Sequence, residues 1–267
     1  MRAAVAVLVV LATSGCSNPL YDAIASAAAD DDNTPAATPD AAPPPVPVAK
    51  PAPCAGALAS WPLDEGTGSS TRDCLGRFPG KLTGAVSWTT GRGGAGHALA
   101  FAGGAVAIED AAALHVGGPP LTPAFSALAW VSAKAPTYPR FFVARADGTQ
   151  DAWGFAVFPA SPDMLSIGMR LSDKAGTATD LKSDAVSVTE WMHVAAVFDG
   201  ATSITFYVDG VSRGKRTFTA AQYAPSVAPL RIGAPITNNA PFEGKLSDVR
   251  LYARALTDGE VKAISTR

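Results

Sequence analysis

Positive charge is scarce in this sequence, and its scarcity excludes one broad class of partner. Aspartate and glutamate outnumber lysine and arginine, which gives a formal net charge of -2. Nucleic-acid-binding proteins concentrate basic residues, and no such footprint is present here. No apolar run reaches the roughly 20 residues that a membrane-spanning helix needs. We therefore expect no nucleic-acid partner and no transmembrane helix.

The common hydrolase motifs are absent or lack their structural context. His-Glu-x-x-His does not occur. Residues 210–214 (GVSRG) match Gly-x-Ser-x-Gly, but they follow a turn between predicted strands, without the helix that this motif requires after the serine. The histidines, His97, His115 and His193, are scattered, and His193 lies in an apolar strand-like run that predicts a packed, structural role. Residues 91–96 match G-x-G-x-x-G, but a strand-like segment follows instead of the helix that dinucleotide binding requires. We interpret residues 91–96 as a loop.

The N-terminal residues differ from the rest of the chain. Met1-Arg2 precedes ten apolar residues, a length typical of a signal peptide and too short for a transmembrane helix. The following Thr13-Ser14-Gly15-Cys16 resembles the lipobox of bacterial lipoproteins, although Thr13 stands where that pattern usually has leucine. The resemblance implies a signal peptide over residues 1–15 and a lipid on Cys16, so that the membrane contact is through a lipid anchor only. The alternative is an ordinary signal peptide with a chance cysteine.

The segment after Cys16 is rich in proline, alanine and aspartate. Residues 30–53 contain no aromatic side chain, and such a composition cannot bury enough apolar surface to offset its chain entropy. We expect residues 16–53 to form a disordered stalk, with the proline-rich part extending over about 70 Å. Ser17, rather than aspartate, after the cysteine indicates an exported lipoprotein of the outer membrane, on its periplasmic face or at the cell surface, by analogy with lipoprotein sorting.

Cys54 and Cys74 are the two cysteines that remain once Cys16 carries lipid. In an exported, oxidising setting a disulfide between them is the default expectation. Two reduced thiols are the alternative. A zinc site is disfavoured because no histidine or third cysteine lies nearby in the sequence.

From residue 54 to residue 267 the sequence is typical of an all-β domain. Short β-type runs alternate with Gly, Pro and Asp turns, and the clearest hairpin spans residues 191–210 around Asp199-Gly200. One short helix is predicted at about residues 258–265, because Thr257 and Glu260 form a capping-box pattern flanked by Leu256 and Val261.

Six stretches, in order along the chain, resemble one family. They are residues 61–68 (WPLDEGTG), 96–103 (GHALAFAG), 125–132 (FSALAWVS), 190–210 (EWMHVAAVFDGATSITFYVDG), 230–234 (LRIGA) and 242–256 (FEGKLSDVRLYARAL). Together they resemble the laminin-G-like, concanavalin A-like jelly-roll domains of bacterial exported proteins. The resemblance implies a two-sheet antiparallel jelly-roll sandwich whose first and last strands are neighbours. It also implies recognition of glycans or proteins, and in some cases a structural calcium.

Calcium is the one bound ion that we consider, and no cofactor is required. Asp64 ends the first predicted strand, and Asp248 lies in the last one, where the apolar pattern slips between Leu246 and Val249 and predicts a bulge. If the first and last strands pair, Asp64 and Asp248 could come close enough to share an ion. The alternative is that both are turn or surface acids.

The expected ligand contacts lie in or beside predicted loops, where function is often carried on a rigid scaffold. They are Trp88, Trp153, Tyr223, Asn238 and Asn239, and Tyr138 has a similar setting. Simple packing is the alternative role for the aromatic residues.

The fold also hosts glycoside hydrolases, which need two carboxylates flanking the scissile bond. No predicted strand offers acids at the i and i+2 or i and i+4 spacing that places both on one face. We therefore expect a non-catalytic recognition module that binds carbohydrate, held on a lipid-anchored stalk. The alternatives are a protein-interaction or adhesion module that binds a surface protein, and a degenerate glycoside hydrolase.

Overall fold

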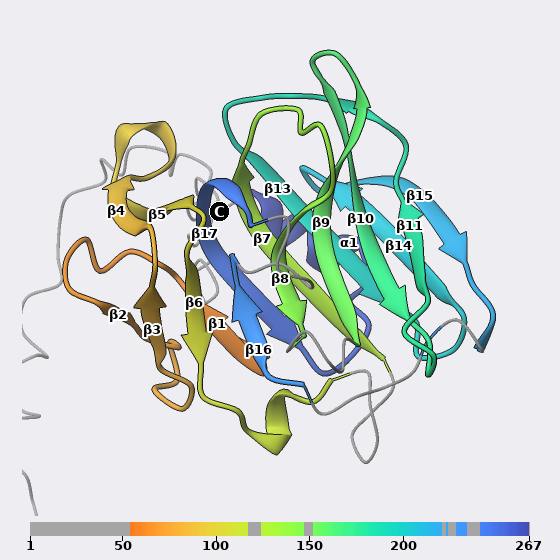
Figure 1. Cartoon of the computed structure of the whole chain (residues 1–267), viewed down its shortest axis with the longest axis horizontal. Helices are drawn as coiled ribbons and strands as arrows, with labels where there is room; N and C mark the ends of the chain where they lie inside the picture. The colour runs from red at the N-terminus through yellow and green to blue at the C-terminus, as the bar shows by residue number, and fades with distance from the viewer. Residues whose placement is uncertain are drawn as a thin grey trace, which may run out of the picture. The chain divides into compact units, whose positions relative to one another are not determined.

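The computed structural model describes residues 54–116, 124–146, 152–220, 223, 228–233 and 241–266. The chain divides into two units, Met1–Val48 and Ala49–Arg267, and every described residue belongs to the second. The predicted signal peptide and stalk, including Cys16, lie outside the described residues. The second unit contains two antiparallel β-sheets that pack face to face (Figure 1).

The first sheet, sheet A, contains eight strands. They are β1 (Ala59–Trp61), β4 (Val86–Thr90), β5 (His97–Ala102), β7 (Phe125–Ser132), β13 (Met192–Phe198), β14 (Ser203–Val208), β15 (Val211–Thr217) and β17 (Glu243–Tyr252). Their order is β15-β14-β13-β7-β17-β5-β4, and β1 pairs with β17 outside this path. The antiparallel pairing of β1 with β17 confirms that the first and last strands are neighbours.

The second sheet, sheet B, contains nine strands. They are β2 (Ser70–Thr71), β3 (Gly80–Thr83), β6 (Ala105–Ile108), β8 (Arg140–Arg145), β9 (Trp153–Ser161), β10 (Met164–Ser172), β11 (Ala178–Lys182), β12 (Val186–Ser187) and β16 (Leu230–Ile232). Their order is β11-β10-β9-β8-β16-β6-β3-β2, with β12 paired to β10. The described helices are the 3-10 helices η1 (Arg92–Gly94) and η2 (Ala112–Leu114) and the α-helix α1 (Asp258–Ser265). Across the described ranges, none of these helices has the length and apolar character needed to cross a membrane.

The main core lies between the two sheets and follows from strand alternation. In the predicted hairpin, Val194, Ala196 and Phe198 of β13 face the core together with Ile204 and Phe206 of β14. This arrangement confirms the hairpin, whose two apolar faces come together because side chains alternate along each strand. A fully buried phenylalanine of this kind stabilises the fold by about 1.5–3 kcal/mol relative to an exposed one.

The opposite face of sheet A is covered in part by α1. Leu128 and Tyr207 of the sheet pack with Leu256, Val261 and Ile264 in a second apolar cluster. Because β7 and β13 are buried on both faces, nearly every residue along them is buried. The predicted C-terminal helix is thereby confirmed, and its apolar side packs on part of this face of sheet A.

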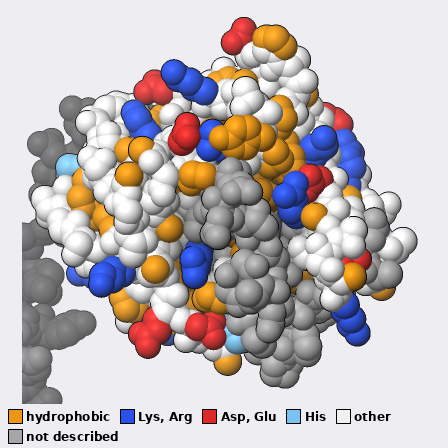
Figure 2. Space-filling model, viewed as in Figure 1, with side chains coloured by type: hydrophobic (Ala, Val, Ile, Leu, Met, Phe, Trp, Pro, Cys, Tyr) orange, Lys and Arg blue, Asp and Glu red, His pale blue; other side chains and the backbone are white. Residues whose placement is uncertain are grey.

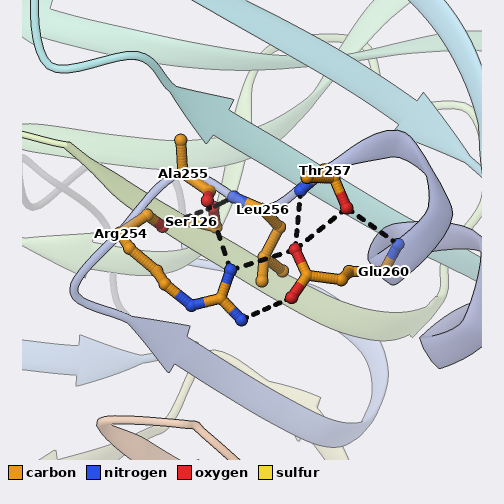
Figure 3. Close-up of polar contacts among 6 residues, drawn as sticks. All are labelled: Ser126, Arg254, Ala255, Leu256, Thr257 and Glu260. Atoms are coloured by element: carbon orange, nitrogen blue, oxygen red, sulfur yellow. Dashed lines mark hydrogen bonds and ion pairs between the residues drawn. The ribbon is translucent and has the colours of Figure 1, made fainter.

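The start of α1 is fixed by two sets of hydrogen bonds (Figure 3). The Thr257 side chain accepts from the Glu260 backbone N–H at 3.3 Å, while the Glu260 carboxylate accepts from the Thr257 N–H at 2.8 Å, so the capping box is present. Ser126 of β7 accepts from the Leu256 N–H at 3.0 Å and donates to the Arg254 carbonyl at 2.9 Å. The helix is therefore tied to the sheet immediately before it begins.

A bulge interrupts β17 where the sequence predicts one. The pairing with β7 shifts register between Ser247 and Arg250, and Asp248 has a positive φ of 50°. The Asp248 N–H donates instead to the Pro62 carbonyl at 2.9 Å. The extra residue therefore turns toward the segment after β1, because a bulge frees one backbone group from the ladder.

Two further predictions concern the N-terminal part of the domain. Cys54 and Cys74 form a disulfide, with their Cα atoms 6.0 Å apart. The glycine-rich residues 91–96 contain η1 and lead directly into β5. They are therefore a turn between strands, as predicted, and offer no long helix N-terminus to a nucleotide.

Candidate functional site

Trp153 is not a ligand contact, which corrects one sequence prediction. Its side chain is completely buried at the start of β9, where its ring stacks on Phe125 at a centroid distance of 5.0 Å. Its indole N–H donates to the Val116 carbonyl at 3.4 Å. Trp153 was expected beside a loop, but β9 begins at this residue and turns its ring into the core between the sheets.

Two of the remaining predicted contacts, Trp88 and Tyr223, lie in different surroundings. Trp88 is partly buried on the edge strand β4, and its indole N–H donates to the Gly68 carbonyl at 2.8 Å. Tyr223 packs against Phe198 and Phe218, and burial raises the pKa of its phenol. Asn238 and Asn239 lie outside the described residues. A role in ligand binding therefore stays a prediction for Trp88, Tyr223 and the two asparagines.

The carboxylate of Asp248 is already occupied by a cation. Its two oxygens accept from Arg250 Nε at 2.7 Å and from Arg250 Nη2 at 2.5 Å, and the charge of Asp248 also acts on Arg92. Asp64 is exposed. Within the ranges described above, no three acidic, histidine or cysteine side chains gather as metal ligands. These residues do not fit the calcium site implied by the family, and calcium binding stays an untested prediction.

A groove of about 740 Å³ lies where the end of β7 approaches the beginnings of β8 and β17. Its lining combines aliphatic, hydroxyl and charged side chains from segments far apart in the sequence. The lining residues are Ser132, Ala133, Lys134, Ala135, Pro136, Thr137, Arg140, Val157, Val188, Thr189, Glu190, Glu243, Gly244 and Lys245. Such a mixture offers hydrogen bonds to a polar ligand and apolar contact to its carbon skeleton.

Tyr138 is not itself one of the lining residues, but it lies in the chain between Thr137 and Arg140, which both line the groove, and its ring contacts Arg140. Its exposed fraction is 42%, and within the described part of the chain only Leu75 and Val211 are comparably exposed large apolar side chains. Tyr138 is thus the one strongly exposed aromatic ring that the structure describes. Figure 2 shows hydrophobic side chains gathered in the upper middle of the viewed face, with acidic and basic side chains beside them.

Arg140 links Tyr138 to the other wall of the groove. Its guanidinium lies 4.1 Å from the centre of the Tyr138 ring, within the range of a cation–π contact. Its Nη1 atom donates to the Pro241 carbonyl at 2.8 Å and lies 3.2 Å from a carboxylate oxygen of Glu243. The ring is therefore placed by a guanidinium that is itself held at the beginning of β17.

Two carboxylates, Glu190 and Glu243, line the groove, and both side chains are exposed. A glycosidase needs one carboxyl group that stays protonated, and enzymes usually achieve this by taking the group out of water. Neither glutamate has that environment. With Lys134, Lys245 and the hydroxyl of Thr137, these acids provide hydrogen-bonding groups around the groove.

The fold and the groove together define a class of protein. Two antiparallel sheets that share a core, with first and last strands paired, form the jelly-roll sandwich of lectin-like domains. The family model described as the concanavalin A-like lectin/glucanases superfamily, of laminin G type, matches residues 103–262. The chain belongs to this superfamily.

Solved structures with the same fold include several binding domains. Domain 4 of AbnA, a GH43 extracellular arabinanase from Geobacillus stearothermophilus in complex with arabinotriose, is 20% identical with a TM-score of 0.56, over 78% of this chain and 98% of that chain. The binding domain of Paraclostridial Mosquitocidal Protein 1 is 14% identical with a TM-score of 0.58, over 79% of this chain and 52% of that chain.

The binding domain of Botulinum neurotoxin DC in complex with rat synaptotagmin II is 12% identical with a TM-score of 0.57, over 79% of this chain and 51% of that chain. The chain therefore spans about half the length of the toxin domains it matches, and nearly all of the arabinanase domain. At these identities the similarity establishes the fold alone.

Proposed function

We propose that this domain is a non-catalytic module that binds carbohydrate in the groove beside Tyr138. The observation that carries the proposal is the exposed Tyr138 ring beside a groove lined by polar groups. Burying an aromatic ring normally stabilises a fold, so a ring held in the open beside a groove is available to a ligand. The apolar face of a sugar ring is the partner that suits it.

The groups around Tyr138 support the same reading. A sugar ring stacked on the tyrosine would meet the hydroxyls of Ser132 and Thr137 and the charged ends of Lys134 and Glu190, which line the groove. Hydrogen bonds from charged groups are stronger than those between neutral groups, and they give orientation to a neutral ligand. Because Arg140 fixes the ring before binding, little side-chain entropy remains to be lost.

Related folds are consistent with a recognition role. The arabinanase domain was solved with arabinotriose, and the neurotoxin DC binding domain was solved both with SialylT and with rat synaptotagmin II. Those ligands belong to those proteins. They support glycan binding as the first function to test here, and protein binding or adhesion as the second.

We also propose that the domain is attached to a membrane by a lipid anchor and a stalk. A lipid on Cys16 and a stalk over residues 16–53 would hold the domain away from an outer membrane, where it would meet glycans or surface proteins. Incorporation of labelled palmitate into the wild-type protein, and its loss in Cys16→Ser, would support the anchor. Unchanged labelling in Cys16→Ser would contradict it.

The binding experiment is a glycan array followed by calorimetric titration of the strongest glycan. We expect Tyr138→Ala to weaken binding at least tenfold, which corresponds to about 1.4 kcal/mol. Tyr138→Phe should retain most of the affinity because it keeps the ring. Leu75→Ala is the matched control, since Leu75 is 49% exposed and does not line the groove.

Equal affinities of the wild type and Tyr138→Ala would refute a site at this ring. A blank array with well-folded protein would shift the proposal to a protein partner, and a pull-down with the same variants would follow. Hydrolysis of the bound glycan would contradict the non-catalytic assignment.

A further inference from the structure

A second group of polar side chains lies on the outer face of sheet A, and none of its members lines the groove. Trp130 of β7 and His193 of β13 are direct partners in the strand register, and their rings are 5.3 Å apart in a T-shaped arrangement. Arg250 of β17 is paired with Leu128, two residues before Trp130 and on the same face of β7. These three side chains therefore occupy neighbouring positions on three adjacent strands, and we call them the Trp130 cluster.

The Trp130 cluster is buried but not satisfied. The exposed fractions of Trp130, His193 and Arg250 are 9%, 1% and 2%. Among the described residues, Trp130 Nε1, His193 Nδ1 and Arg250 Nη1 have no hydrogen-bond partner, and neither has the hydroxyl of Ser60, which lies opposite Arg250 on β1. Leaving one such group unpaired costs about as much as losing a hydrogen bond, so several on one face of a sheet call for an explanation.

The chemistry of the unpaired atoms defines the partner. An indole N–H and a guanidinium N–H can only donate, and the imidazole Nδ1 can donate in one tautomer. A partner shared by these groups must therefore accept hydrogen bonds. A metal cation cannot accept them, so this requirement excludes one at the Trp130 cluster.

The local charges favour a negative acceptor over a neutral one. Arg92 lies over the Trp130 ring at 3.7 Å, and Asp248 gives both oxygens to Arg250. Burial and then the positive charges of Arg250 and Arg92 lower the pKa of His193 to about 3, so the imidazole is neutral at pH 7. The charges that act on this ring are thus two guanidiniums. Asp209 accepts the backbone N–H of His193 at 2.8 Å from an exposed turn.

We propose that the Trp130 cluster binds a small monovalent anion, with chloride as the simplest case. The anion accepts from Trp130 Nε1 and Arg250 Nη1, and Arg92 covers the indole ring from the solvent side. The side chains of Trp130, His193 and Arg250 are more than nine-tenths buried, so little space is left between them. The bound anion should therefore be small. None of the residues that would hold the anion lines the carbohydrate groove. The anion would lie near Asp248, where the sequence predicted a calcium ion.

The first test is thermal unfolding of the purified protein in increasing sodium chloride, matched in ionic strength with sodium gluconate. We expect the melting temperature to rise by several degrees more in chloride and to saturate, because the folded state alone binds the ion. Trp130→Phe keeps a ring beneath Arg92 but removes the donor, and it should lose the chloride-specific rise. Trp88→Phe is the matched control, since it removes an indole N–H that already has a partner, the Gly68 carbonyl, and should keep the rise.

The second test does not depend on the folding of a variant. Crystals of the wild-type protein grown in sodium bromide should show an anomalous peak within hydrogen-bonding distance of Trp130 Nε1 and Arg250 Nη1. An ordered water there, with no anomalous signal and no difference between chloride and gluconate, would overturn the proposal. Either outcome leaves glycan binding at Tyr138 unaffected, so the two proposals can fail separately.

Discussion

The guanidinium of Arg140 lies 4.1 Å from the centre of the Tyr138 ring and also donates to the Pro241 carbonyl at 2.8 Å. One side chain thus connects the loop before β8 to the chain just before β17. The two segments are about a hundred residues apart in sequence, so the exposed ring has a fixed place only in the folded domain. Binding at Tyr138 should therefore depend on Arg140 as a positioning residue.

Replacing Arg140 with methionine tests this dependence. We expect Arg140→Met to weaken glycan binding about threefold to tenfold, because Tyr138 loses its cation–π partner and Glu243 loses its counter-charge. Thermal unfolding should change little, since the salt bridge between Arg140 and Glu243 is largely open to solvent on the glutamate side. Unchanged affinity measured by calorimetry would show that the ring needs no support.

Arg145 should be essential for stability although it does not line the groove. Its fully buried guanidinium donates to the Ala228 carbonyl at 3.0 and 2.9 Å and to the Val116 carbonyl at 3.3 Å. We expect Arg145→Met to lower the free energy of unfolding by about 3 kcal/mol, because buried carbonyls lose their donors. Arg231→Met, at an exposed position of β16, is the control and should change stability by less than about 0.5 kcal/mol. Similar denaturation midpoints for the two variants would refute this assignment.

His193 should make the domain sensitive to acid. Burial and then the charges of Arg250 and Arg92 lower its pKa to about 3, below its ordinary value of 6.5, so the unfolded chain binds a proton that the folded chain does not. The stabilisation is therefore complete above about pH 6.5 and is lost as the pH falls toward 3. Between pH 7 and pH 5 this residue alone should remove about 2 kcal/mol. Denaturant titrations of His193→Gln should show a shallower pH dependence over that window, and parallel curves would contradict the prediction.

The capping box of α1 offers a local test. Thr257→Ala should cost about 1 kcal/mol, because the Glu260 backbone N–H loses its acceptor and the helix covers the outer face of sheet A. Glu260→Gln keeps an acceptor for the Thr257 N–H but removes the charge paired with Arg254, so its effect should be smaller. Chemical denaturation of both variants checks the order, and a larger loss in Glu260→Gln would reverse the account.

Removing calcium should leave the domain unchanged. Asp248 is paired with Arg250 through both oxygens, so an ion at Asp248 would have to displace a buried guanidinium. We expect the same melting temperature in calcium chloride and in EDTA at equal chloride concentration, and the same glycan affinity. A drop in either quantity in EDTA would show that Asp64 and Asp248 hold an ion after all.

The parts of the fold that the sequence predicted are those with a local cause. Alternation placed Val194 and Phe206 in the core, a slip in that alternation located the bulge at Asp248, and Thr257 with Glu260 marked the helix start. Each of these patterns depends only on residues that are a few positions apart in the sequence. The resemblance across residues 61–256 supplied what no local pattern contains, namely which strands lie side by side.

The candidate site was harder to predict because it is assembled from distant segments. Nothing local brings Arg140 together with Glu243 or Thr189. Trp153 was wrongly expected near a loop surface because the start of β9 is set by pairing with β8 and β10, which the sequence did not reveal. Tyr138 lies between Pro136 and Pro139, which does indicate a loop ring, but not which loop aromatic stays exposed.

The central claim is that a sugar ring stacks on Tyr138 beside the groove formed by the end of β7 and the beginnings of β8 and β17. Its most direct test is a crystal structure of the domain with the strongest glycan from the array. We predict density for a sugar ring over the Tyr138 side chain, with polar contacts to residues such as Thr137, Lys134 or Glu190. Density elsewhere, for example on the outer face of sheet B, with Tyr138 untouched, would contradict the claim.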